Sequence, residues 1–179
     1  LKFNVNGSLN NASVQAGNRI VDANISGSVT NSTFAAESSI LRAVIGGSVI
    51  GSHVLAGYNA LTGAVYAGTV GELRVGGRWD GSVLAAGIGP GPDGDFRQTA
   101  DNAAAGGVSS ISVLAISGGY ANSAASRILA DAYIDAAARA QATAAGVLVQ
   151  TADAAPLPSV GLAFGPDTGT TSITTPGGL

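Results

Sequence analysis

The sequence predicts an all-β fold, a parallel β-helix (β-solenoid) with coils of about 20 residues. First, the phrase ISGSV at residues 25–29 recurs in related form at residues 5–9, 45–49 and 75–79, with a weaker copy at 116–120. Second, apolar residues alternate within each unit, which is the period of a β-strand. Third, Gly27 and Asn31 interrupt the alternation, and both residue types are typical of corners. Short strands joined by corners in a repeating unit are typical of a solenoid.

Stacked coils would place equal positions of successive repeats in one column, about 4.8 Å apart along the axis. Three columns are apolar throughout, and we expect them to face the core. They are Val5, Ile25, Ile45, Val75 and Ile116; Leu9, Val29, Val49, Trp79 and Tyr120; and Val14, Phe34, Val54 and Leu84.

Two further columns are polar. One is a ladder of hydroxyls near a corner, formed by Ser32, Ser52, Ser82 and Ser123. The other is an outward column of alternating charge, formed by Asp22, Arg42 and Glu72. Because an exposed ion pair contributes only about 0–1 kcal/mol, this column is expected to fix the register of the coils more than to stabilise them.

The step between repeats lengthens twice, which predicts insertions at corners over residues 58–68 and 88–107. The first is expected to be a small hairpin-like flap. The second contains Asp93, Asp95 and Asp101, whose carboxylates are the oxygen ligands that calcium prefers. The same stretch is also typical of a Pro/Gly/Asp turn with solvated carboxylates, since it lacks the full calcium loop and its terminal Glu. We expect no cofactor to be required, and calcium is the one candidate.

The repeat fades toward the C-terminus. Residues 127–146 are rich in Ala and have good helix propensity, but their apolar positions also alternate as in a strand. We expect one more degenerate coil here and keep a capping helix as the alternative; residues 146–151 predict a strand. Residues 1–150 are therefore assigned to one solenoid domain, and residues 151–179, rich in Pro, Gly and Thr, to an extended tail or linker.

The composition narrows the classes of function. Only 11% of the residues are charged, 27 are Gly, and Cys and Met are absent. A surface built from Ser, Thr, Asn, Ala and Gly suits a regular assembly. A net charge of -3 without a basic cluster argues against binding of nucleic acid. No apolar run has transmembrane length, so no membrane insertion is expected. Because the chain begins at Leu1 rather than Met, we expect a processed product or a piece of something longer.

A family resemblance follows from these motifs. The pattern I-x-G-S-V-x-x-S-x-h-x-A-G, in which h is apolar, is followed by PGPDGDF and by AGGVSSISVLAISG at residues 105–118. This order resembles the β-solenoid repeat domains of very large secreted bacterial surface proteins, the filamentous-haemagglutinin-like adhesin class, over roughly residues 3–126. The resemblance implies a secreted protein, extracellular or at the cell surface, that serves as a stalk, adhesin or fibre module.

Three functions follow from this fold, and a non-enzymatic structural module is the one we expect. The alternative is a glycan-binding adhesin module that uses exposed aromatics of the insertions, namely Tyr58, Tyr66 and Phe96. The third is a polysaccharide-acting β-helix enzyme, which would need carboxylates that converge in a groove. The sequence has one His and 11 acids scattered along the repeats, so no enzymatic activity is expected.

An assembly surface is predicted from the apolar side chains that are expected to face outward. Val44, Ile50, Leu55 and Val83 would form an exterior apolar strip, which marks either a contact surface or a place covered by the chain's own Ala-rich segment or tail. No polar cap precedes Phe3, so the first coil would present bare strand edges. The partners expected are copies of the chain or neighbouring repeats of the same polypeptide, and a head-to-tail contact would build a filament.

Overall fold

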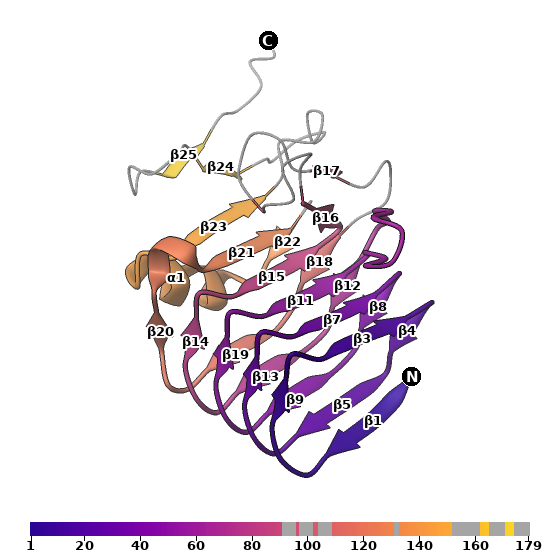
Figure 1. Cartoon of the computed structure of the whole chain (residues 1–179). Coiled ribbons are helices and arrows are strands. Elements are labelled where there is room, and N and C mark those ends of the chain that lie inside the picture. Colours follow the sequence, from indigo (N-terminus) through magenta and orange to yellow (C-terminus); the bar gives the residue numbers. More distant parts are fainter. Residues whose placement is uncertain are drawn as a thin grey trace.

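Stacked parallel strands dominate the fold. The computed structural model describes residues 1–90, 96, 102–103, 109–130, 133–151, 162–164 and 171–173. Within these residues the chain is mostly β, with four parallel sheets and one short α-helix. One circuit through the four sheets is called a coil below, and successive coils lie side by side along the stack (Figure 1). This arrangement fits a parallel β-solenoid.

The four sheets, A to D, follow one another in each coil. Sheet A contains β1 (Lys2–Val5), β5 (Asp22–Ile25), β9 (Ala43–Ile45), β13 (Leu73–Val75) and β19 (Leu114–Ile116). Sheet B contains β2 (Leu9–Asn10), β6 (Val29–Thr30), β10 (Val49–Ile50), β14 (Trp79–Asp80) and β20 (Tyr120–Ala121). Sheet C contains β3 (Ser13–Ala16), β7 (Thr33–Ala36), β11 (His53–Ala56), β15 (Val83–Ala86), β21 (Arg127–Ala130) and β23 (Leu148–Thr151). Sheet D contains β4 (Arg19–Ile20), β8 (Ser39–Ile40), β12 (Thr69–Val70), β18 (Ser110–Ile111) and β22 (Tyr133–Ile134).

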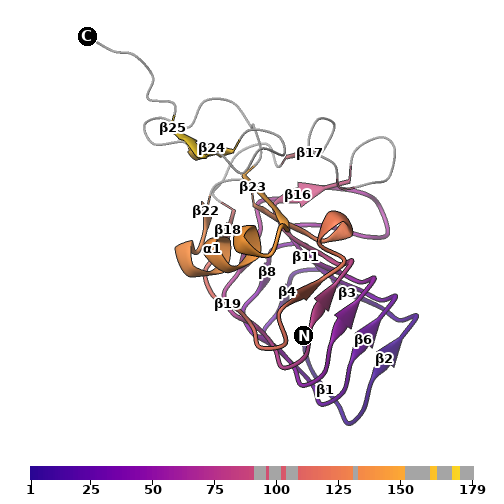
Figure 2. The same ribbon diagram turned by 90° about the vertical axis from the view of Figure 1, so that its left-hand side faces the viewer.

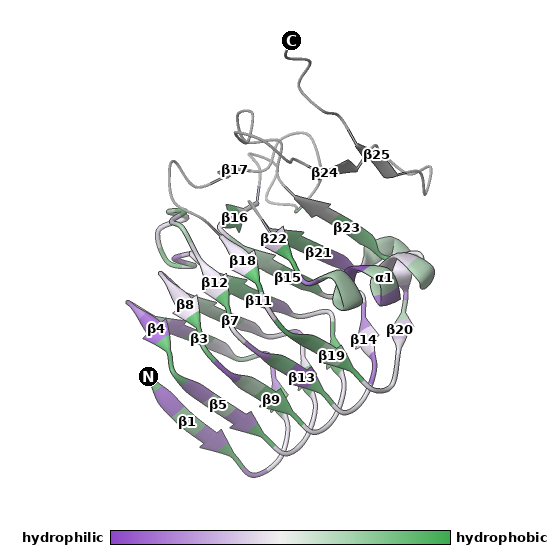
Figure 3. Ribbon diagram, turned by 180° about the vertical axis from the view of Figure 1, so that it is seen from behind, coloured by the Kyte–Doolittle hydropathy of each residue, from purple (hydrophilic) through white to green (hydrophobic). Residues whose placement is uncertain are grey.

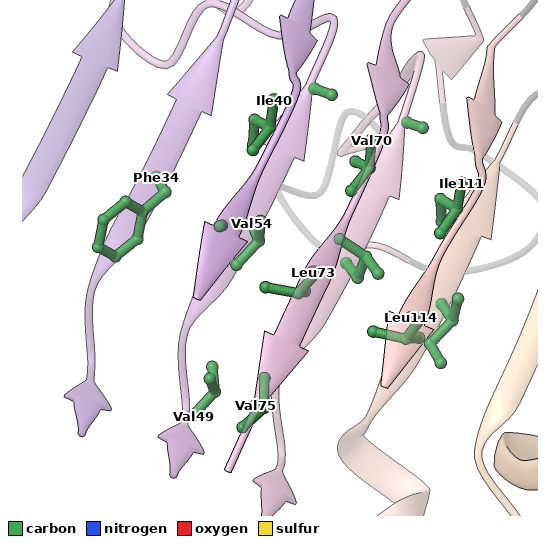
Figure 4. Packing of buried hydrophobic residues seen from close by; sticks show 14 of the residues in the cluster. Phe34, Ile40, Val49, Val54, Val70, Leu73, Val75, Ile111 and Leu114 are labelled. Carbon is green, nitrogen blue, oxygen red and sulfur yellow. The ribbon is translucent and has the colours of Figure 1, made fainter. Parts of the chain in front are cut away.

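The register of the strands confirms the three predicted apolar columns. In sheet A, Ile25 pairs with Val5 on one side and with Ile45 on the other. The columns of sheets B and C are paired in the same way, and the column of sheet C continues into β21 and β23. Because side chains alternate along a strand, one side of each sheet supplies a single core that runs the length of the stack (Figure 4).

The corners explain why polar residues punctuate the repeat. Between sheets B and C the chain turns through left-handed backbone at Asn11, Asn31, Gly51, Gly81 and Asn122, with φ between 46° and 54°. Asn and Gly tolerate this conformation better than other residues. The prediction of a corner at Asn31 is therefore confirmed.

The C-terminal part of the repeat combines both predicted alternatives. Within residues 127–146, β21 and β22 continue the stack, whereas α1 (Ala136–Ala144) is a helix. The carboxylate of Asp135 accepts the Ala138 N–H at 3.0 Å and so caps the helix. Ala138 and Ala142 are buried in the main core, so α1 covers the core where sheets A and B end (Figure 2). The strand predicted at residues 146–151 is present as β23.

Both long segments between repeats leave the stack at the corner between sheets C and D. The first lies between β11 and β12, and Tyr58 pairs antiparallel with Val65, so the predicted hairpin-like flap is confirmed. In the second, β16 (Ile88–Gly89) pairs antiparallel with β17 (Asn102–Ala103). In the tail, β24 (Leu162–Phe164) pairs antiparallel with β25 (Thr171–Ile173).

Candidate functional site

A ladder of serine hydroxyls binds neighbouring coils at the corner before sheet C. Ser32 Oγ accepts the Ala12 N–H, Ser52 Oγ accepts the Ser32 N–H, and Ser82 Oγ accepts the Ser52 N–H, each at 3.0 Å. All three serines are buried. The prediction is confirmed for these three residues.

The prediction that Ser123 is the fourth member of this ladder is wrong. Ser123 belongs to a short 3₁₀ turn, η1 (Ser123–Ala125), that lengthens this corner. Ser126 takes the equivalent place instead, because the residue that follows it, Arg127, pairs with Val83. Ser126 is fully buried like Ser82.

A second serine ladder, which the sequence analysis missed, lies at the corner between sheets A and B. Ser8 Oγ accepts the Ser28 N–H at 3.0 Å, Ser28 Oγ accepts the Ser48 N–H at 3.0 Å, and Ser48 Oγ accepts the Arg78 N–H at 3.1 Å. The signal was present in the repeated Gly-Ser pair. In both ladders, serine hydroxyls accept hydrogen bonds that join neighbouring coils.

The predicted charge column is confirmed on the outer face of sheet A. Arg42 contacts the coil on either side of its own, with Nη1 2.8 Å from Asp22 and Nε 3.3 Å from Glu72. Glu72 also pairs with Arg74. The hydrogen bond from Arg74 lowers the pKa of Glu72 most strongly; partial desolvation opposes it, and the charges of Arg74 and Arg42 act in the same direction as the hydrogen bond.

The four residues of the expected assembly surface have different surroundings. Val44 and Ile50 are half-buried on sheets A and B. Leu55 and Val83, on sheet C, are only 2% and 6% exposed. They are covered by this chain's own residues, so they cannot contribute to a surface that is open in the described chain.

The cover over Leu55 and Val83 is a second apolar cluster, here called the outer cluster. It consists of Ala35, Leu55, Val83, Ala85, Ile88, Phe96 and Leu129, with Tyr58 packed against it. Ile88 and Phe96 come from the second insertion and Tyr58 from the first. Sheet C is therefore packed on both sides, and among the described residues the side chains that cover its outer face come from the two insertions.

The flap between β11 and β12 is held against the first two coils by polar contacts. Gln15 Oε1 accepts the Ala60 N–H at 2.8 Å, and Asn59 Nδ2 donates to Glu37 at 2.6 Å. At the tip, Leu61 is 81% exposed, and Tyr66 is 44% exposed. Of the three aromatics considered for glycan binding, Phe96 is buried and Tyr58 half-buried, which leaves Tyr66 as the most open.

The three aspartates considered for calcium, Asp93, Asp95 and Asp101, lie outside the described residues. Their neighbour Phe96 is described and buried, with its ring centroid 5.5 Å from that of His53 on sheet C. Among the residues that the structure describes, no three His, Cys, Asp or Glu side chains gather closely enough to hold a metal ion. Within the same ranges, no helix has the length and apolar character of a membrane span.

Several core residues of the first coil are less buried than their equivalents in the second coil. Phe3, Val5, Leu9 and Val14 occupy core columns but are only partly buried, although Phe3 stacks on Phe34 with ring centroids 5.8 Å apart. Figure 3 shows apolar and polar residues alternating along β1 and β5 at this end.

Compared with known proteins, the chain matches no family model, no curated protein and no solved structure.

Proposed function

We propose that the chain is a non-enzymatic β-solenoid module of an extracellular or cell-surface fibre or stalk. The observation that carries this proposal is the use of polar side chains between coils. Ser52 links its coil to the one before, and Arg42 links three coils through Asp22 and Glu72. A stack held by contacts that recur at each step keeps its length and register, which is what a stalk requires.

The proposed partners are neighbouring repeats of the same polypeptide or copies of the chain. Val44 and Ile50 keep partial exposure on sheets A and B, and Leu41 is 41% exposed at the corner before sheet A. Apolar residues at these positions favour lateral contacts, while the strand edges favour contacts along the axis.

Electron microscopy of the negatively stained protein, with and without EDTA, tests the proposal. We expect ordered rods or fibres. Order that is lost with EDTA and restored by calcium would support calcium ligation by Asp93, Asp95 and Asp101, and the triple variant to Asn is the matched control. Discrete particles that bind members of a glycan array would instead favour the adhesin function.

Glycan binding remains the second candidate because the flap is a preformed surface. Gln15 binds the Ala60 N–H and Glu37 binds the Asn59 side chain, which hold the flap in place, and a preordered surface binds with a smaller entropic cost. Tyr66 would supply the aromatic face. Loss of glycan binding in Tyr66→Ala, with binding kept in Leu61→Ala, would support this candidate.

A further inference from the structure

The first coil exposes core positions whose equivalents are buried in the second, third and fourth coils. In the second coil, the core positions equivalent to Val5 and Leu9 are Ile25 and Val29, and these are 1% and 0% exposed. Val5 and Leu9 are only partly buried, because no coil lies on their other side in the described chain. The N-terminal face, formed by residues 1–20, thus presents part of the core.

The same face presents unpaired backbone donors. In the second coil, the N–H groups of Ser26, Ser28 and Thr33 point back to the first coil. They bind Val5 O at 3.0 Å, Ser8 Oγ at 3.0 Å and Ala12 O at 2.8 Å. The equivalent donors of the first coil are the N–H groups of Asn6, Ser8 and Ser13, which have no acceptor among the described residues.

The charge on this face indicates which side chain a docked coil would place beside Lys2. Lys2 pairs in register with Asp22, at the start of the column that continues through Arg42 and Glu72. The column alternates in sign, so an acidic residue beneath Lys2 would extend it. At the other end of the core, by contrast, α1 covers the ends of sheets A and B with Ala138 and Ala142.

We propose that the N-terminal face is a docking surface for one further parallel β-coil of the same repeat. The docked coil has apolar residues against Val5, Leu9 and Val14, a serine hydroxyl that accepts the Ser8 N–H, and an acid beside Lys2. Its contacts are continuous with those that already join the coils of the chain. This inference deepens the structural role proposed above, since it defines the direction and chemistry of stacking.

A duplicated coil tests the inference on the full chain. A copy of residues 21–40 is fused before Leu1, which recreates the Ile40–Leu41 junction of the chain because Leu1 stands where Leu41 stands. The copied Asp22 then lies beside Lys2, and the copied Ser28 beside Ser8. We expect amide hydrogen exchange at Asn6, Ser8 and Ser13 to slow by more than about tenfold relative to the unfused chain.

The control is the same fusion with Ile25→Asn, Val29→Asn and Phe34→Asn in the added copy, which is expected to leave these amides exchanging as in the unfused chain. Equal exchange in the two fusions would overturn the inference. Concentration-dependent protection of these amides in the unfused chain, together with a doubled mass by light scattering, would also overturn it by assigning the face to a second copy. Fibres formed without this protection would leave the proposed function standing and remove only the coil-docking inference.

Discussion

The repeated Gly-Ser pair reflects a steric fit between neighbouring coils. A Cβ built on Gly47 would overlap the hydroxyl oxygen of Ser28 and lie 2.7 Å from the Ser28 nitrogen. Gly27 is related in the same way to Ser8, and Gly77 to Ser48. The hydroxyl occupies this space because it accepts an N–H of the next coil. Gly27, Gly47 and Gly77 therefore each leave room for a serine hydroxyl of the neighbouring coil.

Gly47→Ala is expected to lower the free energy of unfolding by about 1–3 kcal/mol, because neighbouring backbone must move to admit the methyl group. Urea unfolding measures the change. Gly17→Ala is the matched control: a Cβ there meets open space, and Gly17 is not in the left-handed region, so no loss is expected. Equal losses in the two variants would contradict the steric explanation.

Ser52→Ala is expected to cost about 1–3 kcal/mol of unfolding free energy, because the buried Ser32 N–H loses its acceptor. Ser52 is 0% exposed, so water cannot readily replace the hydroxyl. The exposed Ser13→Ala serves as the control in the same urea titration. A loss no larger than that of the control would mean that the ladder does not stabilise the stack.

Glu72 is expected to make the free energy of unfolding depend on pH. Its pKa is lowered below the ordinary value of about 4.3, chiefly by the hydrogen bond from Arg74. A carboxyl whose pKa is lower in the folded chain contributes stability above its unfolded pKa and loses it as pH falls through the folded pKa. We expect the difference in unfolding free energy between the chain and Glu72→Gln to shrink as pH falls below about 4.3. A difference that stays constant over this range would contradict the ion-pair column.

At the scale of elements, α1 takes the place of strands. Thirteen residues, 135–147, join β22 to β23, and twelve residues, 21–32, make the equivalent connection from β4 to β7. The earlier segment contributes strands to sheets A and B, whereas the later one forms a helix. Its small buried residues let the helix lie close to the last strands and shield the core from water.

Ala142→Asp is expected to cost on the order of 3–5 kcal/mol, because it places an unpaired charge at the covered end of the core. Ala140→Asp, on the exposed side of the same helix, controls for the change in helix propensity and is expected to cost less than about 1 kcal/mol. Thermal and urea unfolding measure both variants. Similar costs would show that α1 does not protect the core.

The inward columns could be predicted from the sequence because burial demands apolar side chains at the same place in every coil. The segment at residues 127–146 could not be resolved in this way, because Ala is compatible with a helix as well as with a buried strand. The cover over Leu55 had no periodic signal, since Phe96 lies in an insertion outside the repeat. Ser126 was missed in favour of Ser123 because the turn η1 displaces the register by three residues.

At the scale of the molecule, the two ends of the stack differ. Within the described residues, the first coil has partly buried core residues and backbone donors without an acceptor, whereas α1 packs Ala138 and Ala142 into the core at the other end. Among the described residues, the insertions add a second apolar layer on sheet C. The stack therefore has a direction along its axis and one thickened side, and the proposed assembly uses the open face for axial contacts and sheets A and B for lateral ones.

The central claim is that the chain is a stack whose coils are interchangeable units of length. A second copy of residues 21–40 inserted directly after Ile40 tests it, with a second copy of residues 31–40, half a coil, as the control. Small-angle X-ray scattering and urea unfolding are measured on both. We predict that the full-coil variant folds cooperatively and is longer by about 4.8 Å, and that the half-coil variant is strongly destabilised. If both variants lose stability equally, the stack is not built from interchangeable coils and the account is wrong.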